Sequence, residues 1–246
     1  MDPPCAPLHP APAKQIIFPG GGIFFWWQAG VVRALQQRYD LQNPNLTMSG
    51  ASAGSIACVM AACNVEMDVA INAALCLATE GGVFSRTGGL VGVWGGLIER
   101  WLHEMLPNDC HISCSRKVSI SVTVLSCAFV PFHREVVNTF SSKQDLIDAC
   151  LASVHVPFFL DGKFSHRYQG DTCLDGSLLF VARNTPWHIS EKFGENQSAL
   201  ILDYRNDPNL MKRRWGFFET IHKDSLMEMF SMGHEYGMGM DTAFSI

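Results

Sequence analysis

Apolar residues follow two different spacings in the first 65 residues, and the same succession of spacings occurs twice. The short run Lys14–Phe18 ends at a proline and three glycines, after which apolar residues recur at helical spacing over residues 23–38. A turn at Asn43–Asn45 precedes a second run from Leu46, which leads into small apolar residues up to Cys63. Two consecutive strand-to-helix units predict a parallel sheet covered by helices.

The same periodicities predict the remaining elements. We expect helices over residues 66–77, 98–106, 145–153 and 223–240, and strands over residues 118–124, 128–132, 135–140, 173–180 and 199–202, with 128–132 and 135–140 forming a pair. Between Gly81 and Gly96 the chain is dense in glycine with apolar residues interleaved. Such a segment is typical of a lid or an acyl-chain channel, and equally of a buried connection between helices.

The length of 246 residues allows one large α/β domain or two small ones. No linker is recognisable after the first residues, so we expect a single domain over residues 14–246. Residues 1–13 are rich in proline and alanine and have neither the basic part nor the apolar part of a secretory signal. They are expected to form a flexible N-terminal tail.

Composition and charge narrow the classes of partner. The net charge is −5 and the basic residues cluster only at Lys212–Arg214, so nucleic acid is not an expected partner. Nine cysteines are scattered through apolar segments, which favours reduced, buried thiols and a cytoplasmic location. No apolar run reaches the about 18 residues of a membrane span, so any membrane contact is expected to be peripheral.

The segment Gly50–Gly54, Gly-Ala-Ser-Ala-Gly, lies between the predicted strand from Leu46 and the apolar run that follows. A strand that turns sharply into a helix presents Ser52 at the apex, and glycines two positions away on each side let the strand and helix approach closely. Ser52 is therefore a candidate nucleophile. The alternative is a small-residue turn before a tightly packed helix.

A serine that transfers acyl groups needs fixed N–H donors for the oxyanion of its tetrahedral intermediate. The glycine run Gly20–Gly22, between a strand and a helix, can turn several backbone N–H groups toward one point. The alternative is a phosphate-binding turn, but Phe25 stands where a dinucleotide fingerprint has its third glycine, and no Gly-Lys-Ser/Thr follows.

The base that would activate Ser52 is less directly indicated. His188, His222 and His234 follow in the order of a Ser-Asp-His triad, but none lies in a recognisable loop signature. Two Asp-Gly pairs compete as the base, at Asp161 and at Asp175. Asp175 is the better candidate, because its apolar neighbours predict burial, which raises the basicity of a carboxylate. No metal site is expected, since the segment Cys110–Cys114 has no second pair of ligands nearby.

Three ordered motifs, Gly20–Gly22, Gly50–Gly54 and Asp175–Ser177, resemble those of the patatin-like phospholipase family. The similarity covers most of the chain from Ile16 onward. It extends to Ala152–Ser153, Val156–Phe158 and Gly233–Gly237.

This resemblance implies a three-layer α/β/α fold with a central, mostly parallel sheet, and a Ser-Asp dyad without histidine. Ser52 would be the nucleophile and Asp175 its base, with the loop from Gly20 supplying the oxyanion hole through the N–H groups of Gly21, Gly22 and Ile23. The family needs no metal or other cofactor in the catalytic step. Its substrates are acyl esters of phospholipids, galactolipids or acylglycerols, which implies a lipid acyl hydrolase of phospholipase A or acylglycerol lipase type working at a membrane or lipid-droplet surface.

Two residues depart from the family pattern. Phe25 replaces a glycine that commonly follows the oxyanion run, and Trp26 and Trp27 follow it. Ser177 replaces the more usual glycine or alanine of the Asp-Gly motif. The aromatic crowding leaves an alternative open, namely a lipid-binding or scaffold protein whose hydrolase site is weak or inactive.

Overall fold

The computed structural model describes residues 14–126, 132–179, 199–213 and 222–240. Met1–Ala13 and His188, for which the sequence raised expectations, lie outside these ranges. The expected single domain over 14–246 stays a prediction.

Both helices and strands occur along the described residues. The helices are η1 (Gly22–Phe24), α1 (Phe25–Arg38), α2 (Ala53–Ala62), α3 (Met67–Glu80), α4 (Trp94–Met105), α5 (Cys110–Cys114), α6 (Lys143–Ser153), η2 (Tyr204–Asn206), α8 (Pro208–Met211) and α9 (Lys223–Gly239). The strands are β1 (Lys14–Phe18), β2 (Leu46–Ala51), β3 (Val118–Leu125), β4 (Phe132–Val137), β5 (His166–Tyr168), β6 (Asp171–Leu174) and β7 (Ala199–Ile201).

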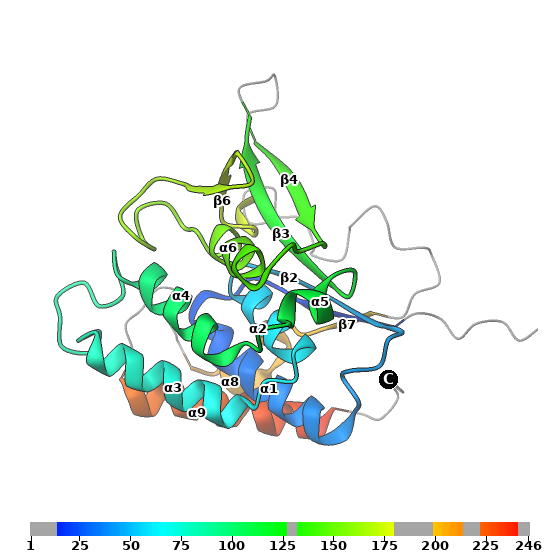
Figure 1. Ribbon diagram of the computed structural model, residues 1–246. Coiled ribbons are helices and arrows are strands. Elements are labelled where there is room, and N and C mark those ends of the chain that lie inside the picture. Colours follow the sequence, from blue (N-terminus) through cyan, green and yellow to red (C-terminus); the bar gives the residue numbers. More distant parts are fainter. Residues whose placement is uncertain (1–13, 127–131, 180–198, 214–221, 241–246) are drawn as a thin grey trace, which may run out of the picture.

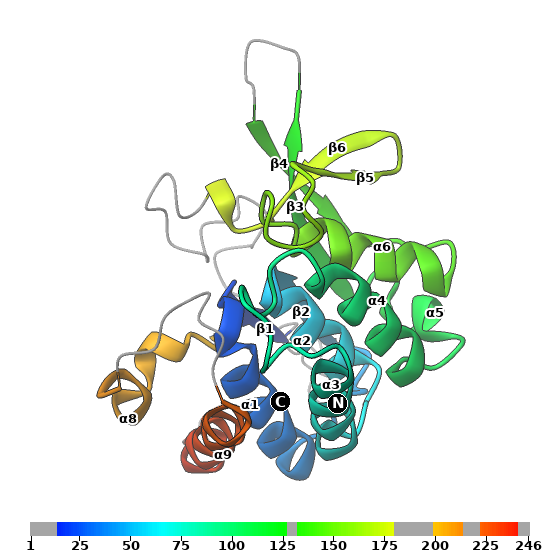
Figure 2. The same ribbon diagram turned by 90° about the vertical axis from the view of Figure 1, so that its left-hand side faces the viewer.

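A single mixed sheet forms the centre of the molecule, and helices flank it (Figure 1; Figure 2). Its core runs in the order β3-β2-β1-β7 with all neighbours parallel. The strands β4 and β6 each pair antiparallel with β3, and β5 pairs antiparallel with β6. β3 is rich in β-branched residues and buried along most of its length, as a covered central strand requires. The α/β fold expected from the sequence is confirmed.

β2 and β6 both pair with the same edge of β3. β2 pairs in parallel with residues 118–121 of β3, whereas β6 pairs antiparallel with residues 123–125. β4 pairs with residues 120–125 and so occupies the opposite edge. β2 and β6 therefore approach each other end to end along one edge of β3. The residues that follow them, Ser52 and Asp175, emerge at the same point although 123 positions separate them.

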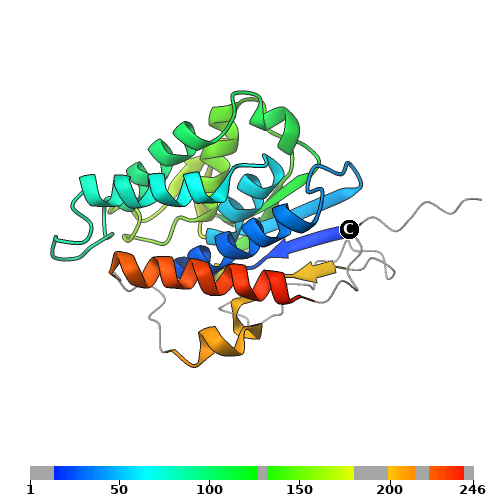
Figure 3. The ribbon, with the colours of Figure 1, turned by 90° about the horizontal axis from the view of Figure 1, so that it is seen from below.

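α1 and α9 lie side by side along their lengths (Figure 3). Two glycines allow this approach: a Cβ on Gly30 would lie 2.0 Å from the carbonyl oxygen of Phe230, and one on Gly233 would lie 2.0 Å from that of Trp27. α1 is covered by α9, α2 and α3, which explains why its first turns are buried on every side and are apolar except for Gln28. The expected α9 stripe is also found, because Leu226 and Met229 are buried.

Some local expectations were wrong. The strand expected over 128–132 lies outside the described residues except for Phe132, which belongs to β4. The strand expected over 135–140 is found over Phe132–Val137 and pairs with β3. The strand expected over 173–180 ends at Leu174. Cys76 is free but exposed, whereas Cys58 is free and buried as expected. Over the described ranges, no helix combines the length and the apolar character that crossing a membrane requires.

Candidate active site

Ser52 lies at the junction of β2 and α2 with φ of 52° and ψ of −136°. A positive φ is uncommon for a residue with a side chain and is typical of functional turns. Glycine is required at positions 50 and 54, because a side chain at either position would clash with backbone atoms. A Cβ on Gly50 would lie 2.4 Å from the carbonyl oxygen of Gly54, and a Cβ on Gly54 would lie 2.1 Å from that of Phe18. The geometry is that of a sharp strand-to-helix elbow with the serine at its apex.

Asp175 follows β6 and its carboxylate reaches Ser52. Ser52 Oγ donates a hydrogen bond to Asp175 Oδ2 at 2.5 Å. The other oxygen, Oδ1, accepts from the backbone N–H of Ser177 at 2.8 Å and from the Ser177 hydroxyl. The competing carboxylate of Asp161 instead accepts from the N–H of Lys163 and lies 3.3 Å from the ammonium group of that lysine. The two residues singled out in the sequence are thus in direct contact.

Burial determines the protonation behaviour of Asp175, which is 6% exposed. Loss of hydration raises the pKa of its carboxyl above the usual range, and hydrogen bonds from Ser177 and Ser52 oppose that rise. A carboxylate made more basic in this way is better suited to accept a proton from a serine hydroxyl than a solvated one.

A buried hydrogen-bond network holds the two residues in place. The N–H of Ser52 donates to Ser153 Oγ at 2.9 Å, and Ser153 Oγ donates to the carbonyl oxygen of Ser121 at 2.7 Å. The carbonyl of Asp175 accepts from Thr123 Oγ1, and its N–H donates to the carbonyl of His155, both at 2.8 Å. Sequence reasoning missed these supporting roles, because isolated small polar residues in apolar segments have no periodic signal.

The glycine loop before η1 is held against this site. Gln28, fully buried on α1, donates from Nε2 to the carbonyl oxygen of Pro19 at 2.7 Å. Gly22 has φ of 52°, which favours glycine. Among the described residues, no hydrogen bond uses the backbone N–H of Gly21, Gly22 or Ile23. These three donors are therefore available to a ligand, whereas the N–H of Ser52 is occupied by Ser153.

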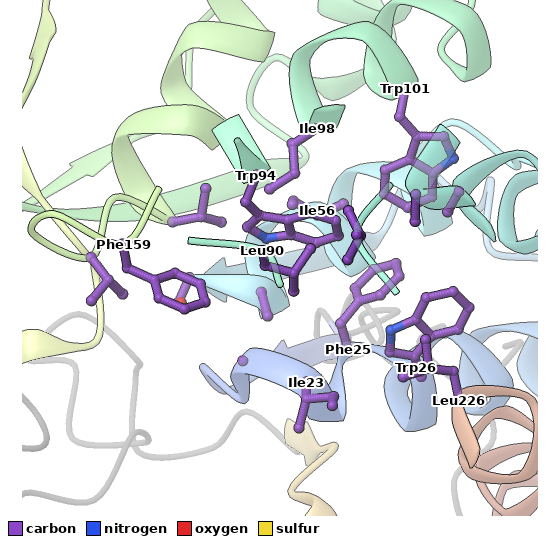
Figure 4. Close-up of a pocket in the computed structure, with 18 of the residues that line it drawn as sticks. Ile23, Phe25, Trp26, Ile56, Leu90, Trp94, Ile98, Trp101, Phe159 and Leu226 are labelled. Atoms are coloured by element: carbon purple, nitrogen blue, oxygen red, sulfur yellow. The ribbon is translucent and has the colours of Figure 1, made fainter. Parts of the chain in front are cut away.

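Ser52 is one of the residues that line an apolar pocket. Figure 4 shows the pocket. Its wall comes from the glycine loop, the first turn of α1, α2, α3, α4, α9, the segment after α6 and the glycine-dense segment 81–96. That last segment is a wall of the pocket, in keeping with the channel interpretation. The labelled lining residues are Ile23, Phe25, Trp26, Ile56, Leu90, Trp94, Ile98, Trp101, Phe159 and Leu226.

The histidines of a possible triad are not brought to Ser52 in the described structure. His222 precedes α9 and is exposed, and His234 bonds through Nε2 to Gln37 Oε1 at 3.0 Å. His155, which the sequence did not single out, touches Asp175 through its backbone, while its Nε2 lies 3.3 Å from the carbonyl oxygen of Lys163. Within the described ranges, no group of three or more His, Cys, Asp or Glu side chains is arranged to hold a metal ion.

Comparisons with known proteins indicate the family of the chain. A family model described as patatin-like phospholipase matches residues 16–190. The chain is 29% identical over 178 residues to the omega-hydroxyceramide transacylase of Homo sapiens, covering 69% of this chain and 31% of that protein. It is 24% identical over 191 residues to the 1-acylglycerol-3-phosphate O-acyltransferase PNPLA3 of Homo sapiens, covering 74% and 38%. The chain spans about a third of the length of these curated relatives. The solved structure of the type III effector protein ExoU aligns at a TM-score of 0.42 and 14% identity, covering 94% of this chain and 53% of that chain.

Proposed function

The chain belongs to the patatin-like phospholipase family, and we propose that it hydrolyses fatty acyl esters of lipids with Ser52 as nucleophile and Asp175 as general base. The observation that carries the proposal is the hydrogen bond to Asp175 Oδ2 from Ser52 Oγ, whose residue lines an apolar pocket. Serine acylation needs this pairing of an activated hydroxyl with a base that is within hydrogen-bonding reach.

In the first half-reaction Asp175 Oδ2 takes the proton of Ser52 while Oγ attacks the ester carbonyl carbon. The negative charge that develops on the carbonyl oxygen meets the N–H groups of Gly21, Gly22 and Ile23, which no hydrogen bond in the described ranges occupies. The tetrahedral intermediate then expels the alcohol, which takes the proton from Asp175, and the acyl group stays on Ser52.

In the second half-reaction water attacks the acyl-serine, with Asp175 as the base, and the free fatty acid leaves. A hydroxyl group of another lipid in place of water would give acyl transfer instead. Two relatives are named as a transacylase and an acyltransferase. Incubation of the protein with mixed lipid vesicles, followed by lipid analysis, separates the two outcomes, because hydrolysis releases fatty acid and transfer produces a new ester.

The bulk of Phe25 is compatible with an active site, because its ring lies in the wall of the pocket. Phe25 is the first residue of α1 and packs edge-on against Trp101, with ring centroids 5.5 Å apart. Both rings form part of the pocket wall, alongside Trp26. Phe25 and Trp26 therefore line the acyl pocket, whereas Trp27 donates from Nε1 to Asp207 Oδ2 at 2.8 Å. The Ser52–Asp175 hydrogen bond forms in the presence of these aromatic side chains.

A fluorophosphonate probe should label the intact protein at Ser52, because only a serine activated by a base reacts with such a reagent. Peptide mass spectrometry locates the adduct. Ser55 offers an internal control, since its hydroxyl is also buried but donates to the carbonyl oxygen of Ser52 at 2.7 Å, and it should carry no label. An unlabelled protein that still binds lipid vesicles would favour the scaffold alternative.

Exposed aromatic residues beside the pocket suggest how a lipid surface is contacted. Phe158 and Phe164 are 61% and 48% exposed, and their ring centroids lie 5.8 Å apart. Phe158 has φ of 65°, an unusual conformation for a bulky residue. The next residue, Phe159, lines the pocket, and its carbonyl accepts from the N–H of Gly92 in the glycine-dense segment. The exposed pair is therefore continuous with the pocket wall and fits a peripheral site for a membrane or lipid-droplet surface; the cytoplasmic location stays a prediction.

Replacing both Phe158 and Phe164 by serine should weaken binding to phosphatidylcholine vesicles by about tenfold or more, since transfer of a buried aromatic ring contributes roughly 1.5–3 kcal/mol. Vesicle sedimentation measures the change. Ile112→Ser is the matched control, because Ile112 on α5 is 70% exposed. The double variant should hydrolyse a soluble short-chain ester at the rate of the unmodified protein. Equal vesicle binding by the double variant and the unmodified protein would contradict the assignment of this surface.

A further inference from the structure

The Ser177 hydroxyl lies beside the Asp175 carboxylate. It donates to Oδ1, which also accepts the Ser177 backbone N–H at 2.8 Å, while Ser52 donates to Oδ2. The two carboxylate oxygens thus have separate partners. One faces the nucleophile, and the other is held by a residue that takes no part in bond formation.

The position of Ser177 depends on the glycine loop. Ser177 is 7% exposed, and a Cβ on Gly20 would lie 2.4 Å from its Oγ. The hydroxyl therefore occupies the space that the missing side chain of Gly20 leaves. Gly20 belongs to the same loop as the oxyanion donors, so one serine contacts both the loop and the base.

We propose that Ser177 is a positioning residue that keeps the Asp175 carboxylate ionised and directs its Oδ2 toward Ser52. This proposal rests on the proposed acyl-serine mechanism. A hydroxyl that donates to a carboxylate stabilises the charged form and opposes the effect of burial. Without this donor, a larger share of Asp175 is protonated at acidic pH, and a protonated carboxyl cannot accept the proton of Ser52. A glycine or alanine at this position lacks the donor.

Other charged or titratable groups lie on the elements around Asp175 in the described structure. His155 follows α6, and its positive charge would favour the ionised Asp175. Arg134 on β4 donates from Nε to Ser121 Oγ at 2.6 Å. The strands β4, β5 and β6 also carry His133, Glu135, His166, Arg167 and Asp171. A substitution at Ser177 changes none of these groups, so a difference in pH dependence reports on the hydroxyl itself.

Ser177→Ala should shift the acidic limb of the pH profile of kcat/KM for a soluble ester to higher pH by about one unit, because a hydrogen bond to a charged group is among the stronger ones. At the plateau kcat/KM should fall by no more than about tenfold, since the backbone N–H still holds Oδ1. Ser177→Gly should show the same shift. Ser177→Thr retains a hydroxyl, so its acidic limb should lie at the same pH as that of the unmodified protein. Ser231→Ala, on the exposed side of α9, is the control.

Several outcomes would overturn the proposal. If the acidic limbs of the kcat/KM profiles lie at the same pH for Ser177→Ala, Ser177→Gly and the unmodified protein, the Ser177 hydroxyl does not affect the ionisation of Asp175. A fall in thermal stability without a shifted limb would show a packing role only. Failure of the proposed mechanism itself is distinguishable, because the unmodified protein would then not be labelled at Ser52 by a fluorophosphonate.

Discussion

Ser52→Ala should abolish the release of carboxylic acid from a soluble nitrophenyl ester, with a fall in kcat/KM of about 10⁴-fold or more. The variant keeps the pocket and the N–H groups of the glycine loop, which no hydrogen bond between described residues uses, but it has no oxygen that can form the acyl intermediate. Loss of the nucleophile in other serine hydrolases leaves only the activity contributed by binding and the oxyanion hole. Absorbance of the released nitrophenolate measures the rate.

The control for this variant must separate lost chemistry from lost structure. Ser52 has a positive φ, in which alanine is strained and glycine is not, so Ser52→Gly is the matched second variant. Both should be inactive, and circular dichroism should show that both are folded. Retention of ester hydrolysis by a pure preparation of either one would refute the assignment of Ser52.

The turn at Ser52 could be predicted from the sequence, because the residues that determine it are its neighbours along the chain. The turn at Ser52 needs glycine at both Gly50 and Gly54, where a Cβ would meet backbone atoms of the elbow or of the adjoining strand end. The periodicity on each side of the motif also indicates a strand followed by a helix. The choice of Asp175 over Asp161 depended on apolar neighbours, and the burial of Asp175 agrees with that reasoning.

The meeting of Ser52 with Asp175 could not be derived from local pattern alone. It depends on β2 and β6 sharing one edge of β3, which is a property of strand register. The antiparallel end of the sheet was not anticipated, because β5 and β6 are too short to give a clear alternation. Ser153 and Thr123 contact the site through single hydrogen bonds between distant segments, and such contacts have no signature in a single sequence.

Asp175→Asn should lower kcat/KM nearly as far as Ser52→Ala does, although the two side chains have the same shape. The amide can accept the two hydrogen bonds of Ser177 through its oxygen, which places its NH₂ group opposite Ser52 Oγ. That NH₂ group donates to the serine and cannot take its proton. The rate on a soluble ester, measured across the pH range, should therefore show no pH at which activity is recovered.

The same substitution should raise stability at neutral pH. Burial raises the pKa of Asp175 in the folded state, so the folded protein binds more protons than the unfolded chain between the unfolded and folded pKa values. The unfolding free energy then decreases as the pH rises through that interval, and the cost of the buried charge is fully present above it. Asparagine carries no charge, so Asp175→Asn should lose this pH dependence. Chemical denaturation at several pH values measures both effects.

Histidine variants complete the test of a two-residue mechanism. His188→Gln, His222→Gln and His234→Gln should each keep ester hydrolysis within about twofold of the unmodified protein; His222 is exposed before α9 and His234 bonds to Gln37, while His188 lies outside the described residues. A triad would instead make one of the three variants nearly as inactive as Asp175→Asn. A correctly folded, inactive histidine variant would therefore refute the dyad. Full activity in all three, together with an inactive Asp175→Asn, would leave the buried carboxylate as the base that activates Ser52.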